Sequence, residues 1–230
     1  MVIGSGMMAK VFELYQSSNE VLIFASGVSN SKAVGGDVFL REELLLKDTI
    51  LKNPGKLLIY FSTCSVYDDS VNKTPYVIHK VKMENLIKRK CSNFYIFRLS
   101  QVVGLARNQT FINYLFTSIQ NNKKIDIYKY STRNLISTDD ALMAVSYLVK
   151  NKIYFNEITN IATPNNILVM DIVKIIEDIT KLSFNYNLLD CGEKIDIDIE
   201  KILNLNMNFD FYKPKYLENI LLDFFNSSKA

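Results

Sequence analysis

The chain has 230 residues and is 48% hydrophobic, which suits one sizeable domain or one domain with a small appendage. Its net charge of +3 comes from interspersed acids and bases, and it is too mild to indicate a nucleic-acid or membrane partner. The single histidine excludes the usual histidine-based metal sites and catalytic triads, so no metal is expected.

Cysteine usage and the distribution of apolar residues indicate the compartment. The 3 cysteines are odd in number and lack metal-like spacing, so we expect reduced thiols in a cytoplasmic protein. No apolar run approaches the roughly 20 residues of a membrane span. No basic region precedes the short apolar run at the N-terminus, so a signal peptide is not expected.

The N-terminus predicts a strand, a glycine turn and a helix that continues to about Gln16. The strand leads directly into Gly4-Ser5-Gly6-Met7-Met8-Ala9, a Gly-x-Gly-x-x-Ala variant of the dinucleotide-binding fingerprint. Glycines let the backbone approach a pyrophosphate, and the start of the helix faces the charge of that group. The same pattern also fits an ordinary strand–helix turn.

A second strand and helix follow. Residues 20–25 predict a strand that ends in small residues, which either border a cofactor or form a simple loop. A glycine-rich link then leads into a helix over residues 39–51.

The stretch from Leu57 to Lys80 is the most informative part of the chain. It begins with an apolar run that is typical of a buried strand and that ends in the hydroxyl residues Ser62 and Thr63. A short polar loop then leads into a helix over residues 76–90. Tyr76 and Lys80 are four residues apart, so they lie on one face of that helix.

Tyrosine and lysine at this spacing can act together as an acid–base device. A free phenol, with a pKa of about 10, is a poor base at neutral pH. A neighbouring ammonium favours the phenolate and lowers that pKa. Thr63 is the best candidate to hold a carbonyl or alcohol oxygen while Tyr76 exchanges its proton. The spacing alone is weak evidence, because it often arises by chance.

The rest of the chain continues the alternation of strands and helices. Further strands are expected over residues 93–99, 124–128 and 157–161, and further helices over residues 110–120, 139–149, 169–181, 199–205 and 214–225. A capping signal precedes the helix at residue 139. This alternation predicts a doubly wound parallel sheet.

Right-handed crossovers in such a sheet would gather several strand ends at one edge. The segments concerned are residues 4–6, 25–29 and 99–101, together with Thr63. We therefore expect a ligand site at the carboxyl edge of the sheet.

With these motifs in place, the chain resembles the extended short-chain dehydrogenases/reductases, the family of NAD-dependent nucleotide-sugar epimerases, dehydratases and ketoreductases. The resemblance covers nearly the whole length and keeps the order and approximate spacing of the family motifs. Besides the glycine turn, the motifs are Phe24-Ala25-Ser26-Gly27, Ser62-Thr63-Cys64-Ser65-Val66-Tyr67, Pro75-Tyr76-x-x-x-Lys80, Arg98-Leu99-Ser100-Gln101-Val102-Val103-Gly104, Arg133-Asn134-Leu135-Ile136-Ser137-Thr138-Asp139-Asp140 and Asn160-Ile161-Ala162.

The resemblance implies a catalytic role for three residues. Thr63 would hydrogen-bond the reacting oxygen, and Tyr76 would be the general acid or base. Lys80 would hold the nicotinamide ribose and lower the pKa of Tyr76. The cofactor, NAD or NADP, would lie against Lys80 and against Gly4, Gly6, Met7, Ala25, Ser26 and Leu99.

The resemblance also implies a nucleotide-sugar substrate, bound by Ser65, Gln101 and Arg133. The planar fork of an arginine suits a nucleotide diphosphate. Two alternatives stay open: Gln101 bonds only a backbone group, or Arg133 forms a surface ion pair. His79 is expected to point to solvent, and Cys64 to be a buried small residue rather than a reactive thiol.

The implied architecture is a Rossmann-like NAD(P)-binding domain over residues 1–160, with residues 106–127 contributing to the substrate side. A small C-terminal α+β substrate-binding region would cover residues 161–230. The family also implies a homodimer through helices 39–51 and 76–90.

The chain departs from the family pattern in two places. Only a short link separates the first helix from Glu20, and the strand at 20–25 already resembles the family's fourth, so we expect the usual second and third strands to be lacking. The second strand normally carries an acidic ligand of the adenosine ribose, so NAD and NADP cannot be distinguished. The loop between Thr63 and Tyr76 is also shorter than usual.

Three functions follow from the motifs. The first is a nucleotide-sugar ketoreductase, in which Tyr76 protonates the oxygen held by Thr63. The second is a 4-epimerase that uses the same residues. The third, of another class, is a noncatalytic nucleotide-binding or scaffold protein. Dehydration is disfavoured, because Cys64 and Ser65 stand where dehydratases of the family carry an acidic pair.

Overall fold

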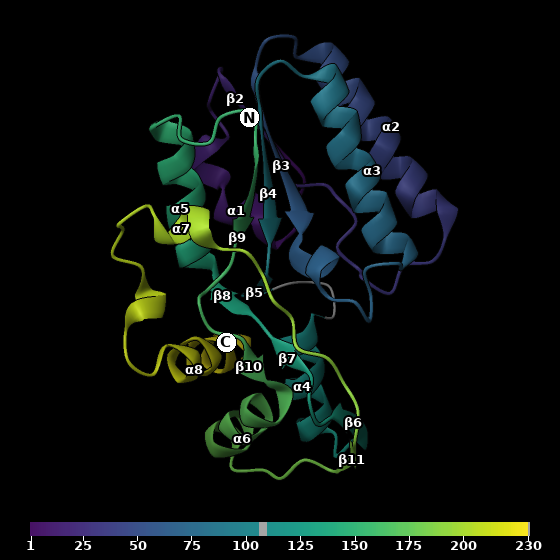
Figure 1. Ribbon diagram of the computed structural model, residues 1–230, viewed down its shortest axis with the longest axis vertical. Helices are drawn as coiled ribbons and strands as arrows, with labels where there is room; N and C mark the ends of the chain where they lie inside the picture. The colour runs from purple at the N-terminus through teal and green to yellow at the C-terminus, as the bar shows by residue number, and fades with distance from the viewer. Residues whose placement is uncertain (106–109, 230) are drawn as a thin grey trace.

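The computed structural model describes residues 1–105 and 110–229. In this part of the chain five parallel strands form the main sheet, in the order β1, β2, β3, β4, β9 (Figure 1). The strands are β1 (Val2–Ile3), β2 (Val21–Phe24), β3 (Leu57–Thr63), β4 (Phe94–Leu99) and β9 (Ile158–Ile161). The parallel sheet predicted from the strand–helix alternation is confirmed.

Helices cover both faces of the sheet, as expected for a doubly wound fold. The helices α1 (Met7–Val11) and α5 (Thr138–Lys150) pack on one face, and α2 (Gly36–Lys52) and α3 (Pro75–Lys90) pack on the other (Figure 1). The buried strands supply both cores, because successive side chains point to opposite faces. In β3, Ile59 and Phe61 join the first core, whereas Leu58 and Tyr60 join the second.

The sheet ends at β1, which pairs with β2 and lies at the edge. The terminal ammonium of Met1 donates to the carbonyl oxygens of Tyr15, Ser18 and Val21, so it ties β1 to the segment before β2. The first helix is short: α1 ends at Val11, and a single 3-10 turn covers Glu13–Tyr15. This arrangement agrees with the expectation that the usual second and third strands are lacking.

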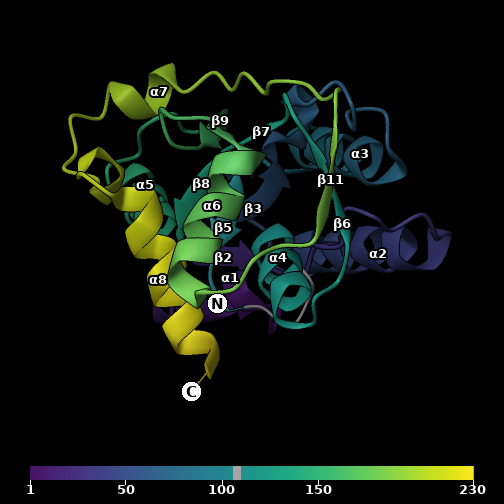
Figure 2. The same ribbon diagram turned by 90° about the horizontal axis from the view of Figure 1, so that it is seen from below.

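A second, smaller assembly lies beyond the carboxyl edge of the sheet. It contains three two-stranded pairs: β5 (Gln101–Val103) with β8 (Leu135–Ser137), β6 (Ile125–Tyr128) with β11 (Tyr186–Leu189), and β7 (Thr132–Arg133) with β10 (Ile167–Leu168). The helices α4 (Phe111–Gln120), α6 (Val169–Thr180) and α8 (Tyr216–Lys229) pack together there (Figure 2). The short helix α7 (Glu200–Leu203) contacts β9.

Several local predictions are confirmed, whereas the domain boundaries stay predictions. Ser137 caps α5 by accepting from the Asp140 amide at 3.0 Å, as the capping signal predicted. Residues 106–109 of the segment expected on the substrate side lie outside the described residues. The core formed by α4, α6 and α8 also takes in Leu135, which the predicted boundary assigned to the sheet domain.

Two further expectations concern the surface: that the chain has no membrane span, and that it forms a homodimer. No helix among the described residues has both the length and the apolar character that a membrane span needs. On α2 and α3 the apolar side chains of Leu40, Leu44 and Ile78 are more than half exposed. These side chains suit the homodimer expected through these helices, which stays a prediction.

Candidate active site

Two hydroxyl groups meet where β3 ends and α3 begins. Thr63 is the last residue of β3, and Tyr76 lies in the first turn of α3. The Thr63 side chain lies close enough to the Tyr76 phenol to act on its pKa. The fold thus joins the two residues that the sequence proposed as oxygen holder and acid–base group.

A tight turn after β3 fixes the Thr63 hydroxyl. Thr63 caps the 3-10 turn Cys64–Tyr67: its Oγ1 accepts from the Ser65 amide at 3.0 Å and donates to Ser65 Oγ at 2.9 Å. Small hydroxyl residues favour such turns, because their side chains replace backbone hydrogen bonds. Ser65, a proposed substrate ligand, therefore lies directly beside Thr63. Cys64 is buried, and burial raises the pKa of its thiol, which confirms the expected inert cysteine.

The Tyr76 side chain is only 8% exposed, and it packs with Val28, Val77 and other apolar side chains. This burial raises the pKa of Tyr76 to about 12, the Thr63 side chain opposes the rise, and the charge of Glu42 adds to it. The expected lowering of this pKa by Lys80 is therefore wrong. The physical reasons are the burial of the phenol and a carboxylate that the sequence reasoning did not place nearby.

Lys80 points inward, away from solvent, and its side chain is 4% exposed. Its Nζ donates to Tyr60 Oη and the Phe61 carbonyl oxygen, both at 3.0 Å, and to Glu42 Oε1 at 3.3 Å. An ammonium has three donors, and here all three have partners inside the protein. A contact between Lys80 and a ribose hydroxyl would have to replace one of them, so the cofactor role of Lys80 stays a prediction.

One residue of this site was not predicted from the sequence: Glu42, a fully buried carboxylate from α2. Burial alone would raise the pKa of Glu42, but Lys80 and hydrogen bonds from His79, Tyr60 and the Val28 amide outweigh it and hold the pKa at about 2. A signal for this burial was present in the sequence. Glu42, Leu46 and Thr49 are the buried residues of α2, and their spacing is that of one helix face.

The expectation that His79 points to solvent is wrong. Its side chain is 5% exposed, and its ring stacks on Phe39 with centroids 4.7 Å apart. Its Nε2 lies 3.1 Å from Glu42 Oε2. The reason is that α2 packs against α3, so a position that would be solvated on an isolated helix is enclosed between the two.

The glycine turn brings the end of β1 against the end of β2. A Cβ on Gly4 would lie 2.4 Å from the Ala25 carbonyl oxygen, and the Gly4 φ of +133° also favours glycine. A Cβ on Gly6 would meet nothing within 4 Å. The close packing of the turn thus explains Gly4, whereas the open space over Gly6 fits a ligand that approaches the backbone. Met7 lies at the start of α1 beside Gly104.

The remaining proposed cofactor residues lie along the same edge. Leu99 ends β4 and pairs in register with Thr63, but its side chain belongs to the core. Ser26 follows β2, and its carbonyl oxygen and hydroxyl both accept from Arg41. Among the described strands, β1 forms the edge of the sheet on this side.

The two other proposed substrate residues come from strands beyond the sheet. Gln101 Oε1 and Ser100 Oγ are buried and have no hydrogen-bond partner among the described residues. Arg133 donates to the Thr132 carbonyl oxygen at 2.8 Å, and its Nη1 lies 3.8 Å from Asp68 Oδ2, just after the turn that follows Thr63. The open alternative of a purely surface ion pair for Arg133 does not fit, since its side chain is three-quarters covered.

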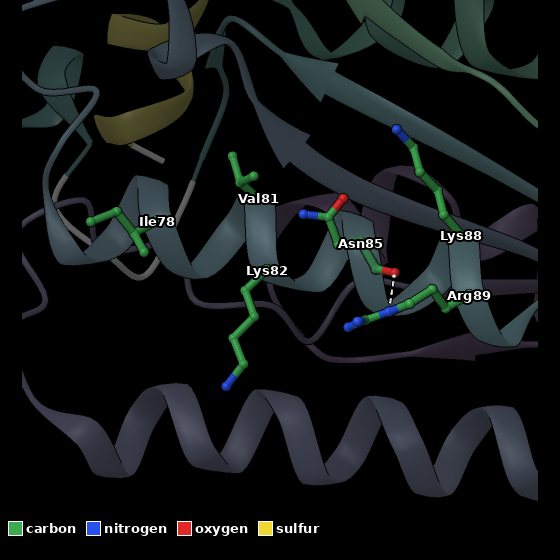
Figure 3. Close-up of a pocket in the computed structure, with 6 residues that line it drawn as sticks. All are labelled: Ile78, Val81, Lys82, Asn85, Lys88 and Arg89. Atoms are coloured by element: carbon green, nitrogen blue, oxygen red, sulfur yellow. Dashed lines mark hydrogen bonds between the residues drawn. The ribbon is translucent and has the colours of Figure 1, made fainter.

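A shallow, open cavity lies elsewhere, along the outer side of α3 (Figure 3). Its lining residues are Ile78, Val81, Lys82, Asn85, Lys88 and Arg89. Lys82 points toward α2, where it binds Glu43 at 2.7 Å, and Arg89 Nε donates to the Asn85 carbonyl oxygen at 3.2 Å (Figure 3). This cavity includes none of the proposed site residues.

Comparison with known proteins relates the fold to solved structures. No protein-family model matches the chain, and no curated protein matches it. A UDP-glucuronic acid 4-epimerase variant from Bacillus cereus, solved with NAD and a fluorinated UDP-sugar, is 19% identical with a TM-score of 0.73, over 95% of this chain and 78% of that one. WbmH from Bordetella bronchiseptica, solved with NAD+, is 16% identical with a TM-score of 0.71, over 97% and 81%.

A reductase structure is also similar. The dTDP-4-dehydrorhamnose reductase from Clostridium acetobutylicum is 13% identical with a TM-score of 0.67, over 96% of this chain and 85% of that one. At these identities the similarity shows a shared fold. The protein thus has the Rossmann-like fold found in nucleotide-sugar epimerases and reductases.

Proposed function

We propose that this protein is an NAD(P)-dependent oxidoreductase that acts on a nucleotide-linked sugar, and that it reduces a keto sugar. The observation that carries the proposal is the Thr63–Tyr76 hydroxyl pair at the carboxyl edge of β3. Open α/β sheets bind their ligands at that edge. Two neighbouring hydroxyl groups can bind one carbonyl oxygen: Tyr76 has a proton to donate, and the Thr63 hydroxyl can rotate to donate the proton that Ser65 Oγ accepts here.

The reaction follows from the protonation of this pair. Thr63 donates a hydrogen bond to the carbonyl oxygen and orients it toward Tyr76. Tyr76 carries its proton at neutral pH, because burial raises its pKa to about 12. As hydride reaches the carbonyl carbon, the oxygen gains negative charge and takes the Tyr76 proton, which yields an alcohol. A reduced nicotinamide held at this edge would supply the hydride and would be oxidised in turn.

The cofactor contacts are proposed at the ends of β1, β2 and β4. Gly6 leaves its backbone open to a pyrophosphate, and Gly4 and Met7 flank it. Ala25 and Ser26 follow the end of β2, and Leu99 lies beside Thr63. Solved structures of this fold contain NAD or NADP, so both are candidates here.

The substrate contacts are proposed on the side of β5 and β7. The unpartnered Gln101 Oε1 can accept from a sugar or nucleotide group, and Ser65 lies next to the reacting oxygen. Arg133 extends from β7 beside Asp68, where its guanidinium can bind a diphosphate in a fork. A nucleotide sugar offers all of these groups in one molecule.

Two other functions have support. A 4-epimerase is supported by the similarity to the UDP-glucuronic acid 4-epimerase structure, and it would use the same three residues. A noncatalytic nucleotide-binding or scaffold protein is supported by the edge position of β1 and by the occupied donors of Lys80.

One assay separates these functions. The purified protein is incubated with NADH or NADPH and with UDP- or dTDP-linked keto sugars, and both nicotinamide absorbance and sugar products are measured. A reductase consumes the reduced cofactor in proportion to the alcohol formed. An epimerase interconverts UDP-sugars without net consumption, and a noncatalytic protein does neither. The Tyr76→Phe variant controls for contaminating enzymes.

A further inference from the structure

Glu42 is the centre of a buried polar cluster that joins three elements. Its carboxylate is fully buried, and each oxygen has partners. Oε1 accepts from Tyr60 Oη at 2.6 Å and from Lys80 Nζ at 3.3 Å. Oε2 accepts from the Val28 amide at 2.6 Å and lies 3.1 Å from His79 Nε2. The cluster therefore links α2, β3 and α3 with the chain that follows β2.

The same cluster fixes the position of the Lys80 ammonium. A Cβ on Gly27 would lie 2.7 Å from Lys80 Nζ and 3.0 Å from Glu42 Oε1, so the backbone at Gly27 closes over the ion pair. The Val28 amide that binds Glu42 follows directly. Glu42 thus holds both the ammonium and the segment that covers it.

The charges around Tyr76 come from every element packed against it. The charge of Glu42, from α2, acts on Tyr76, and Tyr76 acts on Tyr60, from β3. Lys80 and His79 lie on its own helix, and both contact Glu42. A lone ammonium in this buried place would favour the Tyr76 phenolate, whereas the Glu42 carboxylate opposes it and adds to the rise in the Tyr76 pKa.

We propose that Glu42 is a positioning residue for the reaction: it anchors the Lys80 ammonium under Gly27 and opposes its charge, so that the ammonium does not draw the proton from Tyr76. This inference rests on the proposed function. A phenol that holds its proton more tightly is less available as a base for the oxidation of an alcohol.

Charge-removing variants test this role in the cofactor-free protein. Glu42→Gln keeps the side-chain shape and an acceptor for the Val28 amide, but it removes the negative charge. Lys80→Met removes the positive charge, and the double variant removes both. Ring carbon-13 NMR of labelled tyrosine reports phenolate formation, and Tyr76→Phe identifies the Tyr76 signal. Circular dichroism at the same pH checks the fold.

The single variants should shift the titration midpoint of Tyr76 in opposite directions. In Glu42→Gln the titration midpoint of Tyr76 falls by about one pH unit or more, because Lys80 then loses its contacting carboxylate and keeps only the more remote charge of Glu84, which is itself paired with Arg98. In Lys80→Met the midpoint rises, and in the double variant it stays near that of the unmodified protein. An unchanged midpoint in folded Glu42→Gln would overturn the proposal. If Glu42→Gln does not fold, equal midpoints in Lys80→Met and the double variant would overturn it instead.

Activity is a separate measurement, so the two proposals fail in distinguishable ways. A Tyr76 shift in a protein without NAD(P)H-dependent activity would refute the proposed function but not the control of the Tyr76 proton by Glu42. Activity without a Tyr76 shift would support the proposed function and refute the control of the Tyr76 proton by Glu42. In an active enzyme, Glu42→Gln should move the alkaline limb of the pH profile of kcat/KM to lower pH, which a purely structural role would not do.

Discussion

Lys80 Nζ lies 3.3 Å from Glu42 Oε1, and both side chains are almost completely buried. A buried ion pair is weak evidence of net stability, but the loss of one partner leaves an unpaired charge away from water. Replacing one partner should therefore cost much stability, whereas replacing both should cost little.

The first prediction concerns this pair. Lys80→Met should lower the free energy of unfolding by about 3 kcal/mol, because it strands the Glu42 carboxylate. Urea unfolding measures the change. As a matched control, Glu43→Gln on the same helix removes a carboxylate that pairs with the exposed Lys47 and Lys82, and it should cost less than about 1 kcal/mol. Equal losses in the two variants would contradict the assigned burial of Glu42.

The second prediction concerns acid stability. The folded-state pKa of Glu42 is about 2, below its ordinary value of 4.5. Between these pH values the unfolded chain binds a proton at Glu42 that the folded protein does not bind. The contribution of Glu42 is therefore complete above pH 4.5 and is lost as the pH falls toward 2. Glu42→Gln should lose less stability across this window, as measured by urea unfolding. A slope identical to that of the unmodified protein would show that the carboxylate is not held ionised.

A site residue could be predicted from the sequence where its position depends on local patterns, and not where it depends on contacts with residues far along the chain. The strand end at Thr63 and the helix start at Tyr76 follow from local patterns, and the sheet topology then brings them together. Glu42 was missed, because a glutamate in the middle of a helix is usually solvated. Its burial depends on Lys80, His79 and Tyr60, which lie far along the chain.

The errors at His79 and in the pKa of Tyr76 have the same origin. Both predictions treated α3 as if only its own residues mattered. The packing of α2 on α3 encloses His79. Burial of the phenol, with the charge of Glu42, opposes the lowering of the Tyr76 pKa that was expected from Lys80. The balance of charges in a buried cluster is a tertiary property, and spacing along one helix does not contain it.

The third prediction concerns the proposed proton donor. Tyr76→Phe should cut turnover by about two or more orders of magnitude, as the loss of a positioned acid–base group does. Its ring can keep the apolar packing with Val28 and Val77, so the melting temperature should change little. Steady-state kinetics together with a thermal melt give both quantities. Full activity in a folded variant would remove Tyr76 from the reaction.

The fourth prediction concerns the nucleotide diphosphate. Arg133→Ala should weaken binding of a nucleotide sugar by a factor of about ten or more, since a charge-assisted hydrogen bond contributes about 1.5–3 kcal/mol. Isothermal titration calorimetry with UDP-glucose measures the change. Lys129→Ala removes a nearby positive charge that is paired with Asp190 on the surface, and it should leave the affinity unaltered. Similar affinities for the two variants would place Arg133 outside the site.

The most direct test of the central proposal is a titration of the purified protein with NADH and NADPH, followed by nicotinamide fluorescence. We predict saturable binding of at least one of them. We also predict weaker binding to Gly6→Ala, whose added methyl group occupies open space and so should change the free energy of unfolding by no more than about 1 kcal/mol. If neither cofactor binds, reduced or oxidised, and none is carried through purification, the oxidoreductase proposal is contradicted and the noncatalytic function takes its place.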